Sequence, residues 1–365
     1  MSPLRILHIV GRMDRAGAET MIMNLYRAID RDRYQFDFAT FTSSRCDYDD
    51  EIERMGGRVI RIPGGGPLKR FFGLWRRLLQ GEWRIVHSHT LFSTGLHLLA
   101  AKLAGVPVRI AHAHSTNDAN GGTAAGRLYR WLSGKLLTHV PTEYVACGQA
   151  AASFLFPEYL GVHIVPNAID VSAFLKKSSS DARKELGIDS GGLLIIQIGR
   201  LIQVKNHMLS LRIAKALQEM GQGFEMLFVG SGELQDIIEG EISKRGLERH
   251  VRLLGVREDI AALMGAADVM LMPSLHEGFP VVLVESQAAG LPAVVSDAIS
   301  PEVDLGLGLV ELVGLETSPS VWAERIISAA SRPVPEADIR SATLNERGFS
   351  AAANARRLAR MYVQA

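Results

Sequence analysis

The sequence predicts an α/β protein made of two doubly wound domains, and three observations support this. The chain has 365 residues, enough for two domains of ordinary size. Short apolar runs alternate with helical patterns, as in parallel sheets covered by helices on both faces. Both halves also open in the same way, with a strand, a glycine turn and a helix. Ile6–Val10 runs into Gly11, and Leu193–Ile198 runs into Gly199.

The remaining strands follow in order along each half. In the first half we expect a helix from about Glu19, and strands at 36–41, 59–62, 85–88 and 108–113. In the second half we expect a helix from about Asn206 to Met220, and strands at 225–229, 251–254, 269–272 and 293–296. This places an N-terminal domain at 1–168, a C-terminal domain at 169–345, and a last helix within 346–365 that packs back on the N-terminal domain. Ligands of such sheets bind beyond the carboxyl ends of the strands, so the site is expected in the cleft between the domains.

Composition and charge limit the possible functions. Apolar residues make up 47% and charged residues 22%, as in globular proteins. The net charge of +1 argues against a nucleic-acid-binding protein. Residues 1–168 carry 20 Lys and Arg against 14 Asp and Glu, and the rest carry 20 against 25, so the N-terminal half is basic. Cys46 and Cys147 stand far apart without metal-ligand spacing. With no signal peptide or apolar span in the sequence, we expect a cytoplasmic protein with no metal site.

The most informative stretch covers residues 273–285, directly after the predicted strand at 269–272. Gly278 permits a tight turn, and Pro280 suits the first position of a helix. The free N–H groups of such a helix start bind anions such as phosphate. Glu277 and Glu285 bracket this start, where carboxylates can accept hydrogen bonds from sugar hydroxyls. Taken singly, either glutamate could equally be a capping acid or a solvated helix residue.

The whole string resembles the E-x7-E motif of the retaining GT-B glycosyltransferases of family 4. The flanking Pro-Ser-x-x-Glu-Gly-Phe-Pro and Ala-x-Gly-Leu-Pro segments match that family as well. The resemblance implies a GT-B fold and a nucleotide-sugar donor. It also implies that Glu277, Gly278 and Phe279 face the donor sugar beside Pro280, and that Glu285 binds the ribose.

Three further segments resemble motifs of the same family in the same order. Gly199-Arg200-Leu201 with Lys205 resembles its Gly-Arg-Leu…Lys-Asn element, which implies that Arg200 and Lys205 neutralise the departing diphosphate. The turn that begins at Gly230 resembles the family's glycine turn near the nucleotide. The segment 254–259 resembles the one whose backbone brackets the base, which implies that role for Val256 and Arg257. Taken alone, each is an ordinary strand-end turn or a surface charge.

The N-terminal half supplies candidates for contact with the donor sugar and with the acceptor. The loop at 14–20 resembles the family's Gly-Gly-x-Glu loop, with Ala16 in place of the first glycine and Gly17 in place of the second. Histidines follow two predicted strands. The resemblance implies that His114 reaches the donor sugar, and His89 is a candidate for acceptor binding, although a histidine at a strand end is commonly structural.

Segments 69–79 and 127–137 combine aromatic and cationic residues at helical spacing. Such helices can lie on an anionic membrane surface, and they can equally be half-buried helices whose Arg residues face water. A lipid-linked acceptor would make membrane contact useful.

The sequence and the resemblance together predict a retaining transferase. It moves a hexosyl group from a nucleotide diphosphate sugar, by default a UDP-sugar, to a hydroxyl of a glycan or lipid-linked glycan in polysaccharide assembly. We expect no resident cofactor, no required metal and no nucleic-acid partner. The alternatives are a GT-B phosphorylase with pyridoxal phosphate, a nucleotide-sugar epimerase, and a catalytically silent nucleotide-sugar-binding subunit. The presence of Arg200, Lys205, Glu277 and Glu285 together argues against the silent subunit.

Overall fold

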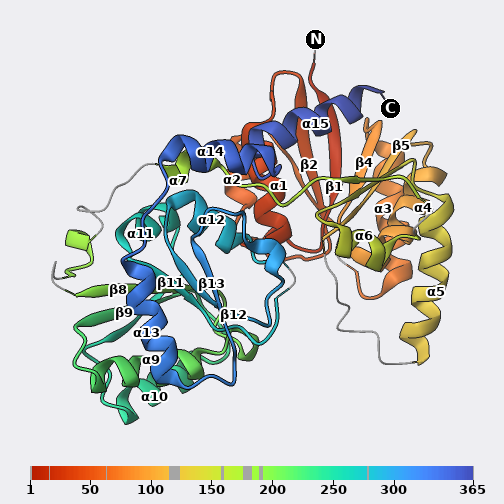
Figure 1. The fold of residues 1–365 in the computed structure, drawn as a ribbon. Helices are drawn as coiled ribbons and strands as arrows, with labels where there is room; N and C mark the ends of the chain where they lie inside the picture. Colours follow the sequence, from red (N-terminus) through yellow and green to blue (C-terminus); the bar gives the residue numbers. More distant parts are fainter. Residues whose placement is uncertain are drawn as a thin grey trace. The chain divides into compact units, whose positions relative to one another are not determined.

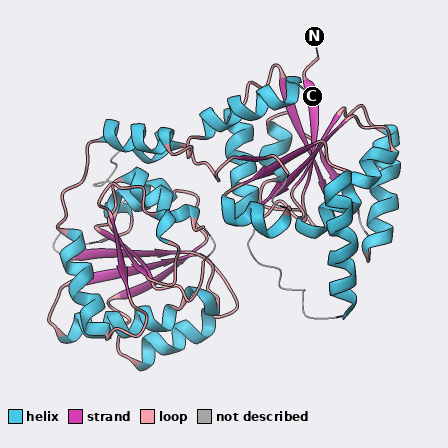
Figure 2. Cartoon of the chain, turned by 45° about the vertical axis from the view of Figure 1, so that its right-hand side comes forward, coloured by secondary structure: helices cyan, strands magenta, loops and turns pink. Residues whose placement is uncertain are grey.

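The computed structural model describes residues 2–15, 17–62, 64–114, 124–157, 160–175, 183–188, 192–277 and 279–364. The chain forms two compact units. The N-terminal unit comprises Met1–Ala168 and Gly348–Ala365, and the C-terminal unit comprises Ile169–Arg347. Each unit is a parallel sheet with helices on both faces, as Figures 1 and 2 show. The predicted α/β fold of two doubly wound sheets is confirmed.

The N-terminal unit contains a seven-stranded sheet of order β3-β2-β1-β4-β5-β6-β7, in which all neighbouring strands are parallel. Its strands are β1 (Leu4–Ile9), β2 (Tyr34–Thr40), β3 (Val59–Arg61), β4 (Ile85–Ser88), β5 (Val108–Ala113), β6 (Glu143–Ala146) and β7 (Val162–Ile164). Its helices are α1 (Gly17–Ala28), α2 (Asp49–Arg54), α3 (Pro67–Gln80), η1 (Leu91–Ser93), α4 (Thr94–Leu103), α5 (Ala124–His139), α6 (Gln149–Leu155) and α15 (Ala351–Gln364).

The C-terminal unit contains a six-stranded sheet of order β10-β9-β8-β11-β12-β13, again parallel throughout. Its strands are β8 (Leu193–Ile198), β9 (Phe224–Val229), β10 (Val251–Gly255), β11 (Val269–Met272), β12 (Ala293–Ser296) and β13 (Val310–Val313). Its helices are α7 (Val171–Leu175), η2 (Gln203–Lys205), α9 (His207–Glu219), α10 (Gln235–Lys244), α11 (Ile260–Ala266), α12 (Val281–Ala289), η3 (Pro301–Val303), α13 (Pro319–Ala330) and α14 (Ala337–Glu346).

Most predicted elements are present within one or two residues of their expected bounds, and five strands match at both ends: β4, β5, β8, β11 and β12. Three strands, β6, β7 and β13, lie outside the predicted ranges. Each has three or four residues and includes a polar one, Glu143, His163 or Glu311, so no continuous apolar run marks it, as one marks the equally short β11. They form because a neighbouring strand already supplies a hydrogen-bonding edge.

The last helix, α15, belongs to the N-terminal unit. Its buried face contributes Ala355, Leu358 and Tyr362 to the core that α1 forms with one face of the sheet. The Asn354 side chain donates to the carbonyl of Pro166 at 3.0 Å, which ties the start of the helix to the segment after β7. In both sheets the strand order reverses at the first strand, between β1 and β4 and between β8 and β11. At such switch points neighbouring loops diverge and leave space for a ligand.

Candidate active site

The loop after β8 meets the loop after β11 at the switch point of the C-terminal unit. Lys205 Nζ donates to Glu277 Oε1 at 2.5 Å, and both side chains are largely buried, with 16% and 15% of their areas exposed. The Asn206 side chain donates to the carbonyl of Pro273 at 3.0 Å. Leu275 N–H donates to the carbonyl of Val204 at 2.8 Å. Three contacts therefore hold the loop that carries Lys205 against the segment 273–277 that carries Glu277.

Asn206 explains where the helix after this loop begins. It has φ 53 and ψ 44, the left-handed conformation that asparagine tolerates better than most residues. The helix α9 accordingly begins at His207, one residue later than expected. The left-handed residue turns the chain sharply between η2, which ends at Lys205, and α9.

Glycines let the loops after β8 and β9 pack backbone against backbone. Gly230 has φ +140, and a Cβ there would lie 2.1 Å from the carbonyl oxygen of Gly199. A Cβ on Gly232 would lie 2.4 Å from the carbonyl oxygen of Leu201. Leu201 N–H donates to the carbonyl of Ser231 at 2.9 Å across the same contact. The predicted glycine turn is thus a site of close approach that no side chain could occupy.

The two arginines predicted near the donor differ in their contacts. Arg200 is exposed directly after Gly199, and its side chain forms no ion pair or hydrogen bond with any described residue. Arg257 instead bonds Asp259 through two nitrogens, at 2.8 and 2.6 Å. This pairing raises the pKa of Arg257 and lowers that of Asp259. Val256 beside it is exposed. Arg200 is therefore available to bind an anion, whereas the Arg257 side chain is already paired with Asp259.

The helix α12 begins one residue later than the sequence predicts. Pro280 was expected as its first residue, and that is wrong by one position. Pro280 is the N-cap, with ψ 102, and its carbonyl accepts from Leu283 N–H at 3.0 Å. No side chain caps the helix start, so its first N–H groups remain available in the way an anion site requires. The helix ends at Ala289, and Gly290, with φ 73, is its left-handed C-cap.

The residues around the start of α12 supply acids and apolar surface. Glu277 forms an isolated parallel bridge with Ile299, so its backbone is held as well as its side chain. Phe279 packs at the edge of the core beneath β11 and β12. Glu285 lies on α12, and burial raises the pKa of its carboxyl to about 7. Gly278 lies outside the described residues.

The sequence-predicted residues of the N-terminal unit lie at two places. Gly17 is the exposed first residue of α1. His89 and His114 follow β4 and β5, and His89 Nδ1 pairs with His114 Nε2 at 2.7 Å. His89 Nε2 pairs with Nδ1 of His8 at 3.0 Å. Both ring nitrogens of His89 are therefore engaged, and an acceptor would have to displace one of these bonds.

Three further side chains, His87, His112 and Tyr362, extend this histidine cluster, and none of them was predicted as a site residue. His87 Nε2 pairs with His112 Nδ1 at 3.1 Å, and His87 Nδ1 pairs with the Tyr362 hydroxyl at 3.1 Å. Neither His8 nor Tyr362 was predicted as a site residue. The available signal for His8 was its place in the first strand, where it pairs in register with His87. Tyr362 had no such signal because its position depends on how α15 packs.

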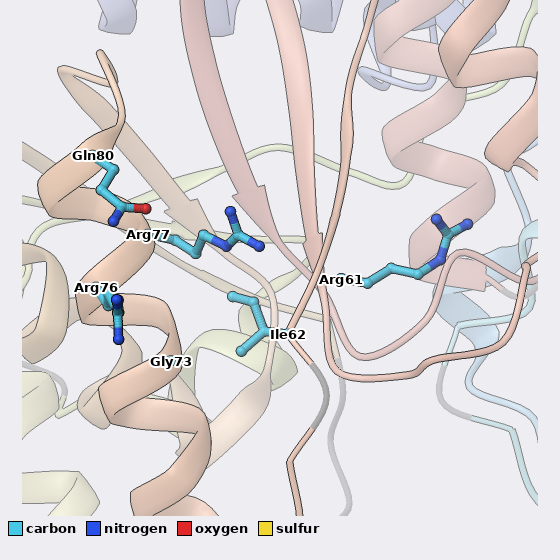
Figure 3. A pocket seen from close by; sticks show the side chains of 6 residues that line it. All are labelled: Arg61, Ile62, Gly73, Arg76, Arg77 and Gln80. Atoms are coloured by element: carbon cyan, nitrogen blue, oxygen red, sulfur yellow. The ribbon is translucent and has the colours of Figure 1, made fainter.

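A pocket of about 370 Å³ lies beside α3. Arg61, Arg76 and Arg77 line it, together with Ile62, Gly73 and Gln80. Figure 3 shows Arg77 extending from α3 toward Ile62, whereas Arg61 extends away from it. Arg61 is ion-paired with Asp49. The three guanidinium groups therefore do not converge on a common point, and this pocket is no match for a bound diphosphate.

The helices α3 and α5 carry the two aromatic and basic segments. Leu74 and Leu78 of α3 are buried, while Leu68, Phe72 and Leu79 are exposed. On α5, Trp131 and Leu132 are exposed, and the Lys135 ammonium lies 6.0 Å from the centre of the Trp131 ring. Both helices are thus half-buried and also present large apolar side chains to solvent. Among the described helices, none has the length and apolar character to cross a bilayer.

Comparison with known proteins identifies the family. The model of the glycosyl transferase 4-like domain matches residues 16–168, and that of glycosyl transferases group 1 matches residues 178–343. EpsF of Bacillus subtilis (strain 168) is 40% identical over 371 residues, covering 99% of this chain and 97% of EpsF. An Escherichia coli UDP-Gal:alpha-D-GlcNAc-diphosphoundecaprenol alpha-1,3-galactosyltransferase is 28% identical over 239 residues, covering 63% of this chain and 62% of that enzyme.

Solved structures show the same fold. The crystal structure of Anabaena HepE in complex with UDP and glucose has a TM-score of 0.79 at 19% identity, and the match covers 99% of this chain and all of HepE. The sheet order, the motifs at the carboxyl ends of β8 and β11, and the whole-length match to EpsF agree. The chain belongs to the group 1 glycosyltransferases, whose two parallel-sheet units form the GT-B fold.

Proposed function

We propose that this glycosyltransferase moves a hexosyl group from a UDP-sugar to a hydroxyl of a lipid-linked glycan in polysaccharide assembly, with retention of anomeric configuration. The main evidence for the donor site is the Lys205–Glu277 pair, which joins the loop after β8 to the segment before α12. Arg200, in the same loop after β8, has no partner among the described residues. Two cations, a free helix start and a carboxylate are what a sugar diphosphate needs.

The residues have separate roles in this proposal. Arg200 and Lys205 stabilise the diphosphate as negative charge builds on it, so no metal is required there. Glu277, with the amides of Gly278 and Phe279 next to Pro280, holds the hexose, and Glu285 holds the ribose. The backbone at Gly199, Gly230, Val256 and Arg257 surrounds the nucleotide. His114 and the loop at Gly17 serve the donor sugar from the N-terminal unit, and His89 serves the acceptor.

The reaction balances without an enzymic nucleophile. The bond from the anomeric carbon to the phosphate oxygen breaks, and a bond to the acceptor oxygen forms on the same face of the ring. The acceptor proton passes to the departing phosphate, so the products are UDP and the extended glycan.

Named relatives support the choice of substrates. The Escherichia coli relative uses UDP-Gal and a diphosphoundecaprenol-linked acceptor. A Staphylococcus aureus relative, CapH, is a capsular polysaccharide biosynthesis glycosyltransferase. The exposed Phe72 and Trp131 on basic helices suit contact with an anionic membrane, which is where such an acceptor lies.

A ligand panel tests the donor. Wild-type protein is heated with UDP, GDP and ADP and with their hexose conjugates. A ligand at 100 times its Kd should stabilise the fold by about 2.7 kcal/mol. We expect that only UDP and UDP-hexoses stabilise the wild type, and that they stabilise Glu285→Ala less. Stabilisation by GDP or ADP instead contradicts the choice of UDP, and no response to any nucleotide favours a silent subunit.

Flotation with liposomes tests membrane contact. Wild-type protein should float with anionic vesicles at low salt and less with neutral ones. Phe72→Asp should weaken flotation. The matched control is Ile237→Asp on α10, because Ile237 is exposed to the same degree as Phe72, 56% against 57%. Equal loss in both variants, or no flotation of the wild type, would refute the membrane contact.

A further inference from the structure

Two His-x-His pairs lie side by side at the carboxyl ends of β4 and β5. They are His87 with His89 and His112 with His114. Side chains two residues apart on a strand face the same side of a sheet, so each pair presents both rings to one face. His8 on β1 is in register with His87 and adds a fifth ring to the same face.

We propose that His89, His112 and His114 bind a divalent transition-metal ion of the zinc type. One ring nitrogen of each lies within 4.8 Å of those of the other two. Three nitrogens around a tetrahedral zinc ion stand about 3.4 Å apart, given Zn–N bonds of about 2.0–2.1 Å. Metal binding would require the rings to rotate until the three nitrogens reach that spacing.

The hydrogen bonds assign the nitrogens that face the metal. His89 Nδ1 and His114 Nε2 point at each other at 2.7 Å. His112 Nε2 is buried without a hydrogen-bond partner among the described residues. These three nitrogens form the inner set. Without a metal, His112 Nε2 is a buried polar atom without a partner among the described residues, which is unfavourable.

The outer nitrogens of two ligands already have partners. His89 Nε2 pairs with His8 Nδ1 at 3.0 Å, and His112 Nδ1 pairs with His87 Nε2 at 3.1 Å. His87 in turn pairs with the Tyr362 hydroxyl. Metal-bound histidines characteristically donate their second N–H to such a partner, which fixes the tautomer and the ring orientation. His8 and His87 are therefore positioning residues for the metal ligands.

The ligand set selects the class of metal. All three ligands are imidazole nitrogens, which suit transition metals such as zinc, copper, iron and nickel. Among the described residues, no carboxylate bonds to these rings, so the site suits Zn²⁺, Co²⁺ or Ni²⁺ rather than Mg²⁺ or Ca²⁺. Three protein ligands leave a fourth position for water or a substrate oxygen.

This ion is separate from the donor diphosphate, whose charge the proposed function assigns to Arg200 and Lys205. With Nε2 of His114 on the metal, its Nδ1, which has no hydrogen-bond partner among the described residues, is left for the donor sugar. His89 would serve the acceptor through the fourth position of the ion. All three ligands belong to the N-terminal unit. The site therefore requires no nucleotide sugar, and its test is independent of the glycosyltransfer test.

The experiment uses the full chain prepared without a polyhistidine tag, stripped with a chelator and titrated with Co²⁺ and then with Zn²⁺. We expect the visible absorption of tetrahedral Co²⁺, a stoichiometry of about one, and displacement by Zn²⁺. His112→Gln and His114→Gln should each weaken binding at least 100-fold, and His8→Phe should weaken it about tenfold by removing a positioning contact.

His97→Gln is the matched control. His97 is a buried histidine on α4 that bonds Thr90 Oγ1 at 2.7 Å and lies outside the cluster. The His97→Gln variant should bind Co²⁺ as tightly as the wild type does. Absence of the Co²⁺ spectrum in the wild type overturns the proposal and leaves the five histidines as a hydrogen-bonded network. Equal loss in His97→Gln and His112→Gln overturns it as well. The wild-type spectrum decides the question even where a variant fails to fold.

Discussion

Lys205 and Glu277 form a direct ion pair across 72 residues of sequence, with 2.5 Å between Nζ and Oε1. The lysine follows β8 and the glutamate follows β11, which are hydrogen-bonded neighbours in the sheet. The aliphatic stem of Lys205 also lies against Gly199, where a Cβ would be 3.0 Å from Cε. One side chain thus contacts two predicted donor motifs, and its removal should affect the reaction more than the fold.

Lys205→Met should lower kcat/KM by about 100-fold or more, because it removes a cation from the departing diphosphate. It also leaves the largely buried Glu277 carboxylate without its partner, and we expect a loss of about 1–3 kcal/mol in unfolding free energy. Steady-state kinetics and urea unfolding measure the two effects. Lys244→Met is the control, because Lys244 is an exposed residue paired with Glu241. Equal kinetic effects in both variants would contradict the role of Lys205.

Arg200 and Arg257 form a second matched pair. Arg200 is unpaired among the described residues, and Arg257 is bonded to Asp259. Arg200→Ala should lower kcat about 100-fold. Arg257→Ala should leave nucleotide affinity within about twofold, since its backbone is proposed to contact the base, and the exposed pair contributes less than about 1 kcal/mol. Calorimetric titration with UDP and initial-rate measurements separate the two. A larger loss in Arg257→Ala would reverse the assignment.

Glu285 should make stability depend on pH. Its pKa is about 7 in the folded protein and 4.5 without burial, so the folded state holds the proton more tightly. The free energy of unfolding therefore falls as pH rises from about 4.5 to 7. Glu285→Gln should be more stable than the wild type at pH 8, by at most about 3 kcal/mol, and no more stable below pH 4.5.

Urea unfolding across this pH range measures the difference. The same variant should bind UDP more weakly, because glutamine has one acceptor oxygen where a carboxylate has two, so it cannot accept one ribose hydroxyl on each oxygen. The exposed Glu324→Gln on α13 serves as the control. A constant difference between Glu285→Gln and wild type at all pH values would refute the burial effect.

Gly230→Ala should destabilise the C-terminal unit by about 2–4 kcal/mol, because the new Cβ meets the Gly199 carbonyl oxygen at 2.1 Å and φ is +140. Gly240→Ala is the counterpart. Gly240 lies exposed within α10 with nothing within 4 Å of its Cβ, so alanine should stabilise by about 0.5–1 kcal/mol. Thermal unfolding of both variants provides the test, and a tolerated Gly230→Ala would disprove the close approach.

The sequence by itself determined the fold class and the order of the donor motifs. Apolar runs such as Ile85–Ser88 and Val269–Met272, and the turn residues after them, are local signals whose meaning does not depend on distant contacts. The same reasoning placed Glu277 before the first residue of a helix and Glu285 after it. It erred at Pro280 by one residue, because helix boundaries depend on which N–H forms the first bond.

Tertiary structure decided which distant residues meet. Sheet register brings His8 beside His87, and the packing of α15 brings Tyr362 to that cluster. Sheet order likewise brings Lys205 to Glu277. A local pattern predicts an element and the face that a side chain occupies. It does not predict which strands become neighbours, because that choice is made by burial of the helix and sheet faces against each other.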